Sequence, residues 1–255
     1  MRYFLKKLHK LIFKYYSLSA VNSFDRRKAC VQAFLGGLPQ GSKLIDVGAG
    51  TQQYRNYATH LDYIAQDFAK YDGLGDGSLN QSIDWDVSKT DIISDILEIP
   101  VEDSSFDYVL CTDVLEHVPR ASDACNELRR IVKDGGKILI TVPTQCDAHQ
   151  APYFFSGGYT HHFFNEIFKD DLVEVTFESG YFETVDQKIY LGLVNLYQLT
   201  VNEKKFRYLF LFFMYLFFSA PLVLILRSLP SVFEDAGNNG LFILITKLRP
   251  KSKQK

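Results

Sequence analysis

Three short apolar runs, each with an aspartate at or near its carboxyl end, constrain this chain more than any other feature of its sequence. They lie at residues 43–48, 63–67 and 91–95, and each is typical of a buried strand. Two further runs of the same kind follow at residues 106–112 and 137–142. Stretches with helical spacing or turn residues separate them. Strands that alternate with helices in this way predict a parallel sheet with crossover helices, an α/β fold.

The remaining elements are predicted from the periodicity of apolar residues and from glycines that end helices. Helices are expected at residues 3–17, 23–35, 52–60, 122–132 and 165–179, and strands at 182–189 and 240–247. Gly36-Gly37 and Gly135-Gly136 are expected to stop the helices that precede them. Residues 70–90 are rich in Gly, Asp and Ser and are expected to form a loop.

Composition excludes several classes of protein. The formal charge of −2, from 28 basic and 30 acidic residues, excludes a generally polycationic nucleic-acid binder. The four cysteines form no C-x-x-C pair, so we expect reduced thiols in a cytosolic protein and no metal site. The first 17 residues interleave bases with apolar residues, and we expect no cleavable signal peptide there.

The turn after the first predicted strand reads Asp46-Val-Gly48-Ala-Gly50. Glycines at this point let the backbone approach a ligand closely, at the edge of the sheet where open α/β folds bind their ligands. A nicotinamide dinucleotide fingerprint would need a third glycine where this chain has Gln53. The spacing therefore argues against a dinucleotide as the ligand.

Two further aspartates end the second and third predicted strands. Asp67 can accept hydrogen bonds from both hydroxyls of a ribose, or it can be a solvated loop residue. Asp95 can receive an adenine amino group, or it can form an N-cap or Asx-turn before Pro100. Both alternatives stay open for each residue at this stage.

With the segment F-D-Y-V-L-C-T-D-V-L-E-H-V-P at residues 106–119, the sequence resembles the class I S-adenosylmethionine-dependent methyltransferases, of the small-molecule type. The resemblance covers residues 40–145 well and residues 180–250 loosely. It implies a three-layer Rossmann-like sandwich with a seven-stranded, mostly parallel sheet, whose last strand at 240–247 is antiparallel. It also implies S-adenosyl-L-methionine as the cofactor.

The same resemblance implies a role for each residue of the cofactor site. Asp46, Gly48 and Gly50 would cradle the methionine end, and Asp67 would hold the ribose hydroxyls. The adenine would be read by Asp95 and Ile96, while Cys111 and Thr112 would line the floor under the sulfonium.

A hydroxyl acceptor usually needs a base. The candidates are four histidines and two acids, namely His117, His149, His161, His162, Glu116 and Glu166. His117 follows the fourth predicted strand, whereas His149 and His161 lie in the aromatic, glycine-rich segment after the fifth. We expect residues 145–165 to close over the acceptor. A metal site at His161-His162 is not expected, because adjacent side chains rarely share an ion.

An uncharged run at residues 208–226 is long enough to cross a bilayer. A single crossing would separate the last strand from its sheet, and Pro221 should break the helix. We therefore expect an interfacial or re-entrant helical hairpin, beside a basic amphipathic helix at residues 3–17 that lies on anionic lipid. The alternative is a private apolar subdomain.

These observations predict four segments and one function. The segments are an N-terminal helical part (1–37), a methyltransferase core (38–190), an apolar insertion (191–236) and a last strand with a basic tail (237–255). The function is O-methylation of a small, sugar- or lipid-linked acceptor at the cytoplasmic face of a membrane. The alternatives are a C- or N-methyltransferase of a lipid-soluble metabolite and a catalytically silent membrane scaffold. Nucleic acid is not expected as a partner, because no Asn-Pro-Pro-Tyr-type motif follows the fourth strand.

Overall fold

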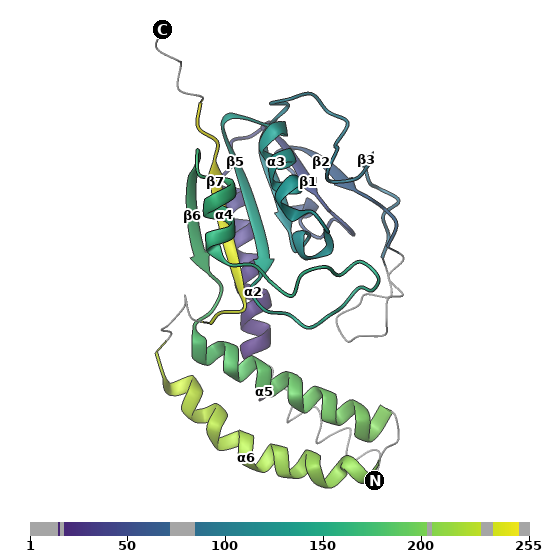
Figure 1. The fold of residues 1–255 in the computed structure, drawn as a ribbon, viewed down its shortest axis with the longest axis vertical. Helices are drawn as coiled ribbons and strands as arrows, with labels where there is room; N and C mark the ends of the chain where they lie inside the picture. Colours follow the sequence, from purple (N-terminus) through teal and green to yellow (C-terminus); the bar gives the residue numbers. More distant parts are fainter. Residues whose placement is uncertain (1–14, 16–17, 72–84, 203–205, 231–236, 250–255) are drawn as a thin grey trace. The chain divides into compact units, whose positions relative to one another are not determined.

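The computed structural model describes residues 15, 18–71, 85–202, 206–230 and 237–249 (Figure 1). The chain divides into two compact units. Residues 27–176 and 240–255 make up the first, here called the sheet unit, and residues 1–26 and 177–239 make up the second, the helical unit.

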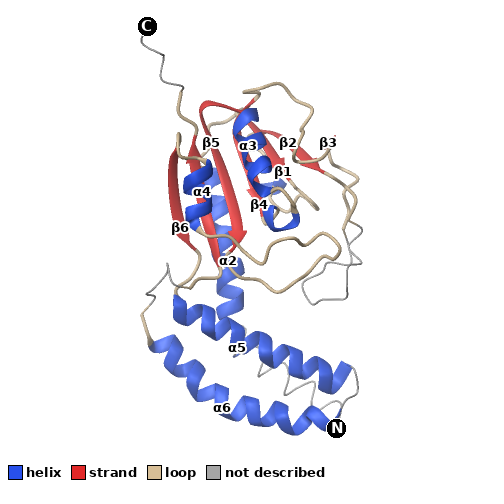
Figure 2. Ribbon diagram, viewed as in Figure 1, coloured by secondary structure: helices blue, strands red, loops and turns tan. Residues whose placement is uncertain are grey.

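A seven-stranded sheet organises the sheet unit, with its strands in the order β3-β2-β1-β4-β5-β7-β6 (Figure 2). Neighbouring strands from β3 to β5 pair in parallel, and β7 pairs antiparallel with β5. This topology confirms the Rossmann-like fold and the antiparallel last strand that the sequence predicts. The strands are β1 (Lys43–Val47), β2 (Asp62–Asp67), β3 (Ile92–Ile93), β4 (Phe106–Thr112), β5 (Val132–Pro143), β6 (Leu172–Phe177) and β7 (Gly240–Thr246).

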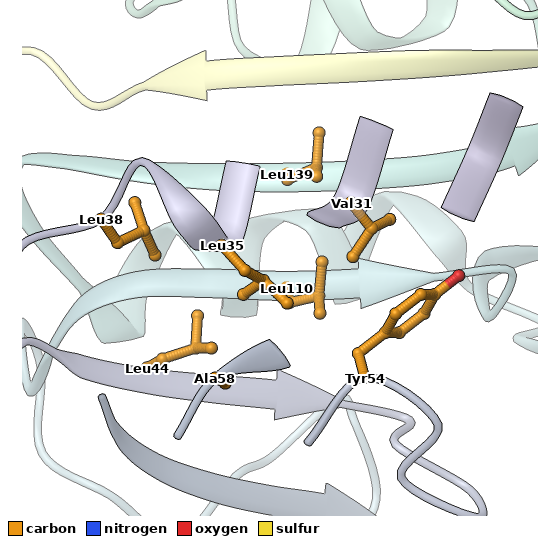
Figure 3. Packing of buried hydrophobic residues seen from close by; sticks show 8 residues of the cluster. All are labelled: Val31, Leu35, Leu38, Leu44, Tyr54, Ala58, Leu110 and Leu139. Atoms are coloured by element: carbon orange, nitrogen blue, oxygen red, sulfur yellow. The ribbon is translucent and has the colours of Figure 1, made fainter. Parts of the chain in front are cut away.

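Helices cover both faces of this sheet. In Figure 1, α3 (Ala121–Ile131) lies in front of it, and the part of α2 (Leu18–Gly36) that belongs to the sheet unit lies behind. Figure 3 shows Val31 and Leu35, one helical turn apart on α2, pointing onto the strands. The buried cluster that they form also contains Leu38, Leu44, Tyr54, Ala58, Leu110 and Leu139. Truncating one of these leucines to alanine should cost about 2–5 kcal/mol, because the sheet cannot collapse into the space.

Two predictions of local structure are wrong in detail. Residues 52–60 form only the short 3-10 helix η1 (Arg55–Tyr57). Gly135-Gly136 does not stop α3, since β5 begins at Val132 and contains both glycines. A Cβ on Gly136 would lie 2.5 Å from the carbonyl oxygen of Asp107, so this glycine serves the close approach of β4.

A larger error affects residues 161–197. A helix is predicted at 165–179 and a strand at 182–189, but the structure has α4 (His161–Ile167), then β6, then α5 (Tyr181–Tyr197). The alternation in Leu172-Val-Glu-Val-Thr-Phe is a strand signal with period two, and α5 opens with a capping arrangement in which the Gly180 N–H donates to Glu183 at 2.9 Å. Both signals were present in the sequence and were overlooked.

The helical unit contains α5 and α6 (Leu209–Ser228), joined through the π-helical turn Gln198–Asn202 and the 3-10 helix Phe206–Tyr208. Leu193, Phe212 and Val223 form its buried cluster. Arg227 donates to the buried Asp186 at 2.7 Å, which ties the end of α6 to α5.

Pro221 does not break α6, contrary to the sequence prediction. A proline removes one backbone donor, but the remaining bonds of a 20-residue helix can maintain it. By length and composition α6 is able to cross a membrane, and only 22% of its apolar window is buried. The exposed large side chains include Phe210, Phe217, Phe218, Leu224 and Ile225. The predicted amphipathic helix at residues 3–17 lies outside the described residues, apart from Tyr15.

Candidate cofactor and acceptor site

The turn after β1 adopts a conformation that favours glycine. Gly48 and Gly50 have φ values of +69° and +50°. A Cβ on Gly48 would lie 2.4 Å from a methyl carbon of Val114, and one on Gly50 would lie 2.8 Å from the Trp85 ring. The groups that the structure places against this turn are the side chains of Val114 and Trp85, and the close approach of a ligand stays a prediction.

Asp46 is a buried carboxylate that is only half satisfied. The Tyr63 hydroxyl donates to its Oδ2 at 2.5 Å, whereas Oδ1 is buried with no hydrogen-bond partner among the described residues. Burial, followed by the nearby charge of Asp67, raises the pKa of Asp46 to about 7. A ligand that brings a donor or a positive charge to Oδ1 would complete this site.

Asp67 lies buried at the end of β2 and holds two turns in place. Its Oδ2 accepts from the Gly50 N–H at 2.9 Å, and its Oδ1 accepts from the Ala69 N–H at 2.8 Å. Each carboxylate oxygen retains a further lone pair, so the contact with ribose hydroxyls stays a prediction. Asp95 is exposed and accepts from the Leu97 N–H at 3.0 Å, which is the Asx-turn alternative, and Ile96 beside it is buried.

The end of β4 lies beside the glycine turn, because Val47 of β1 is paired with Cys111. Cys111 is fully buried, and burial raises its pKa well above the ordinary value. Thr112 is partly exposed. Asp113 follows in the left-handed region, with φ of +53°, and pairs with Arg27 from α2.

Next along the chain, the 3-10 helix η2 (Leu115–His117) carries a second buried carboxylate. Glu116 is 2% exposed, and burial, followed by the charge of Asp113, raises its pKa to about 8. The rings of His117 and His149 lie 4.9 Å apart, and Phe154 contacts both. Burial lowers the pKa of His117, which favours the neutral imidazole.

The segment at residues 144–160 carries His149 and places it beside Glu116 and His117. The Phe155 N–H donates to the Glu116 carbonyl at 2.8 Å, and the Tyr159 hydroxyl donates to the Leu115 carbonyl at 2.7 Å. Tyr153 packs edge-on against Phe68, which directly follows Asp67. The segment therefore spans the edge of the sheet from the end of β2 to η2. His161 lies apart from the cluster, at the start of α4 against His162.

Sequence reasoning missed several residues of this region, among them Trp85, Tyr63, Val114 and Arg27. Trp85 stands over Gly50 and packs edge-on against Tyr71 at 5.3 Å. As the only tryptophan, set in a polar loop, it offered a signal that could have been noticed. Arg27 offered none, because nothing in its surroundings marks it as the partner of Asp113.

A comparison with protein families identifies the domain that contains this edge of the sheet. The family model described as "Methyltransferase domain" matches residues 45–140, from β1 into β5. The match therefore contains the glycine turn, the ends of β2 and β4, and η2. Residues 45–140 of this chain form a class I S-adenosylmethionine-dependent methyltransferase domain.

Curated relatives match part of this chain. It is 34% identical to uncharacterized protein MJ0638 of Methanocaldococcus jannaschii, over 39% of this chain and 40% of that protein. It is 30% identical to a demethylmenaquinone methyltransferase of Bacillus mycoides, over 53% of this chain and 60% of that protein. The chain thus spans less than two thirds of either relative.

Solved structures share the fold. The [4+2]-cyclase SpnF superposes with a TM-score of 0.53 at 15% identity, covering 88% of this chain and 81% of that one. A sarcosine dimethylglycine methyltransferase structure from Galdieria sulphuraria gives a TM-score of 0.50 at 17% identity, covering 89% and 85%.

The residues present fit the cofactor of this family. A buried acceptor atom on Asp46 lacks a donor, and the turn at Gly48 and Gly50 has no room for a Cβ. The methyltransferase cofactor carries an ammonium group, which suits the free oxygen of Asp46, and two ribose hydroxyls, which suit the carboxylate of Asp67. The glycine turn leaves room for its methionine end.

Proposed function

We propose that this protein transfers the methyl group of S-adenosyl-L-methionine to an oxygen of a small, lipid- or sugar-linked acceptor at a membrane surface. The observation that carries the proposal is the cluster of Glu116, His117 and His149 beside the glycine turn, on the same edge of the sheet. In the reaction a new oxygen–carbon bond forms, the sulfur–methyl bond breaks and its electron pair stays on sulfur, and the acceptor hydroxyl loses its proton.

The cofactor half of the site would use the residues that the resemblance implies. Asp46 would receive the ammonium group of the methionine end, which meets Gly48 and Gly50, and Asp67 would accept from the ribose hydroxyls. Asp95 and Ile96 would meet the adenine, with Cys111 and Thr112 under the sulfonium. Such a site accelerates methyl transfer mainly by holding the acceptor oxygen in line with the methyl group.

The acceptor half would use the histidine cluster. Oxygen is favoured over carbon or nitrogen because a hydroxyl must be deprotonated as it reacts, and the half-buried imidazole of His117, whose pKa is lowered by burial, can accept that proton. The segment at residues 144–160 would exclude water from the acceptor. His161 stays a weaker candidate, because it lies outside the cluster.

The membrane part of the proposal is supported by α6. Its exposed face carries Phe210 at 70% exposure and Phe217 at 73%, and such a patch is typical of a surface that meets lipid or a partner. Arg207 precedes this face and can meet anionic headgroups. An acceptor held in a bilayer would then be presented to a protein attached to the same surface, on the cytoplasmic side.

A two-step experiment tests the proposal. Calorimetry with S-adenosylhomocysteine should show one site per chain, and incubation with methyl-labelled cofactor and a membrane lipid extract should transfer label to an acid- and base-stable ether. Cofactor binding without transfer to any extract would favour the silent scaffold. Label on carbon or nitrogen would favour the other methyltransferase classes.

Attachment is tested separately by flotation with anionic liposomes. The full chain should rise with the vesicles. If it stays at the bottom of the gradient, the membrane part of the proposal is wrong while the methyltransferase part stands.

A further inference from the structure

Glu116, His117 and His149 place their ligand atoms close enough to share one ion. One carboxylate oxygen and one nitrogen from each imidazole all lie within 4.8 Å of one another. All three residues belong to the sheet unit, and two of them come from the same 3-10 helix. The third reaches them from a segment 32 residues further along the chain.

Both imidazoles have the same nitrogen, Nδ1, within hydrogen-bond distance of a backbone carbonyl oxygen. Nδ1 of His117 lies 2.5 Å from the Tyr153 carbonyl oxygen, and Nδ1 of His149 lies 3.0 Å from that of Asp147. A carbonyl oxygen can only accept, so each Nδ1 carries the proton and each Nε2 carries a lone pair. Metal-binding histidines are usually oriented by a hydrogen bond of this kind.

One side-chain oxygen of Glu116, Oε2, is buried and has no hydrogen-bond or ion-pair partner among the described residues. Glu127, in contrast, has both oxygens engaged by Arg130, at 2.7 Å each. A buried carboxylate without such a partner is costly unless it is protonated or a positive charge reaches it.

We propose that these three residues bind one divalent transition-metal ion of the zinc type. Two imidazole nitrogens and one carboxylate oxygen form a donor set that suits Zn²⁺, whereas Mg²⁺ and Ca²⁺ prefer oxygen throughout. Three protein ligands leave at least one coordination position open, as in zinc sites that carry out chemistry.

For catalysis the inference rests on the proposed function but changes the proton acceptor, because imidazole nitrogens that bind the ion cannot also accept the proton of the acceptor. An acceptor hydroxyl on the open position would lose its proton to water more readily, because the ion stabilises the oxyanion. That oxygen would then take the methyl group from the sulfonium. Binding of the ion itself does not depend on methyl transfer, so the two claims can fail separately.

The experiment uses the full chain, stripped of metal with a chelator and then dialysed. Zn²⁺ is titrated by calorimetry, and Co²⁺ is added in parallel, because its visible absorption reports the ligand number. The site variants are Glu116→Gln and His149→Ala. The matched controls are Glu174→Gln, at an exposed position of β6, and His60→Ala, in the turn before β2. Binding of S-adenosylhomocysteine reports whether each variant is folded.

The expected result is one equivalent of metal in the wild type and in both controls. Each site variant should bind Zn²⁺ at least about 100-fold more weakly, since even the loss of an outer partner costs about 10- to 100-fold. S-adenosylhomocysteine should bind all five proteins equally. If Glu116→Gln does not fold, His149→Ala still tests the proposal. It alters a segment that lies outside the strands and helices and is therefore less able to disturb the fold.

Two results would overturn the proposal. One is a chain that binds S-adenosylhomocysteine but takes up no stoichiometric Zn²⁺ or Co²⁺. The other is equal metal affinity in the wild type and in both site variants. A chain that binds the metal but not S-adenosylhomocysteine would retain the metal site and refute the proposed function instead.

Discussion

The core of the sheet unit and helix α6 of the helical unit differ in how far they bury their apolar side chains. In the sheet unit, strand and helix residues such as Val31, Leu110 and Ile140 are completely buried. In the helical unit, α6 is uniformly apolar, and Phe217 and Phe218 are 73% and 64% exposed. The comparison indicates a division of labour, in which the first unit builds a binding site and the second offers a surface. If that is right, substitutions should affect one property and spare the other.

The largest effect is expected for Gly48→Val. The new side chain would collide with Val114 and would require a left-handed backbone that valine strongly disfavours. The free energy of unfolding should fall by about 2–5 kcal/mol, from overpacking and backbone strain together. Calorimetry should detect no S-adenosylhomocysteine binding. The liposome association of the protein that remains folded should be unchanged, and a parallel loss of flotation would argue against two independent functions.

Asp67→Ala should have the next largest effect. The change removes the acceptor for the Gly50 and Ala69 N–H groups and the proposed acceptor for the ribose. The free energy of cofactor binding should weaken by about 1.5–3 kcal/mol, which is about 10- to 150-fold in Kd. Asp62→Ala, at the exposed other end of β2, is the matched control. Wild-type affinity in Asp67→Ala would mean that the ribose binds elsewhere.

The double variant Phe217→Ser, Phe218→Ser tests the helical unit. Both side chains are exposed, so the free energy of unfolding should change by less than about 0.5 kcal/mol per site. Liposome partitioning should fall by about tenfold or more, because each phenyl group removed from lipid forfeits apolar transfer energy. S-adenosylhomocysteine affinity should stay at the wild-type value. Unchanged flotation together with weaker cofactor binding would reverse the assignment of the two units.

The smallest effect concerns protons at Asp46. Its pKa of about 7 in the free protein means that it is partly protonated near neutral pH. A bound ammonium group favours the carboxylate and lowers this pKa, so binding should release about half a proton at pH 7, and cofactor affinity should rise as the pH passes through 7. Calorimetry in buffers of different ionisation enthalpy measures the release. Asp46→Asn should abolish it, and proton uptake in the wild type would contradict the placement of the ammonium group.

The same contrast explains what could be predicted from the sequence. Strands β1, β2 and β4 have short apolar runs with defined ends, and their parallel pairing brings Asp46, Asp67 and Cys111 to one edge of the sheet. The uniform run of α6 has no polar face, so the sequence could not indicate how the helix is oriented or that it passes through Pro221.

The acceptor side was less predictable for another reason. His117 and His149 were each candidates, but only the hydrogen bonds of residues 144–160 bring them together with Glu116. Those contacts depend on an irregular segment whose path no periodicity describes. The orphaned oxygen of Glu116 is likewise a property of packing, since an identical glutamate in a looser turn would meet water.

The larger segment of the helical unit, residues 177–239, is inserted between β6 and β7, which are neighbours in the sheet. The segment between Phe177 and Gly240 thus connects two adjacent strands at one border of the sheet. In the strand order, β4 and β5 separate this pair from β1. Insertions at such a junction can be lengthened, replaced or removed during evolution without altering the register of the strands that hold the cofactor. Related chains with the same sheet are therefore free to differ most between these two strands, where a change leaves the glycine turn and the ends of β2 and β4 untouched.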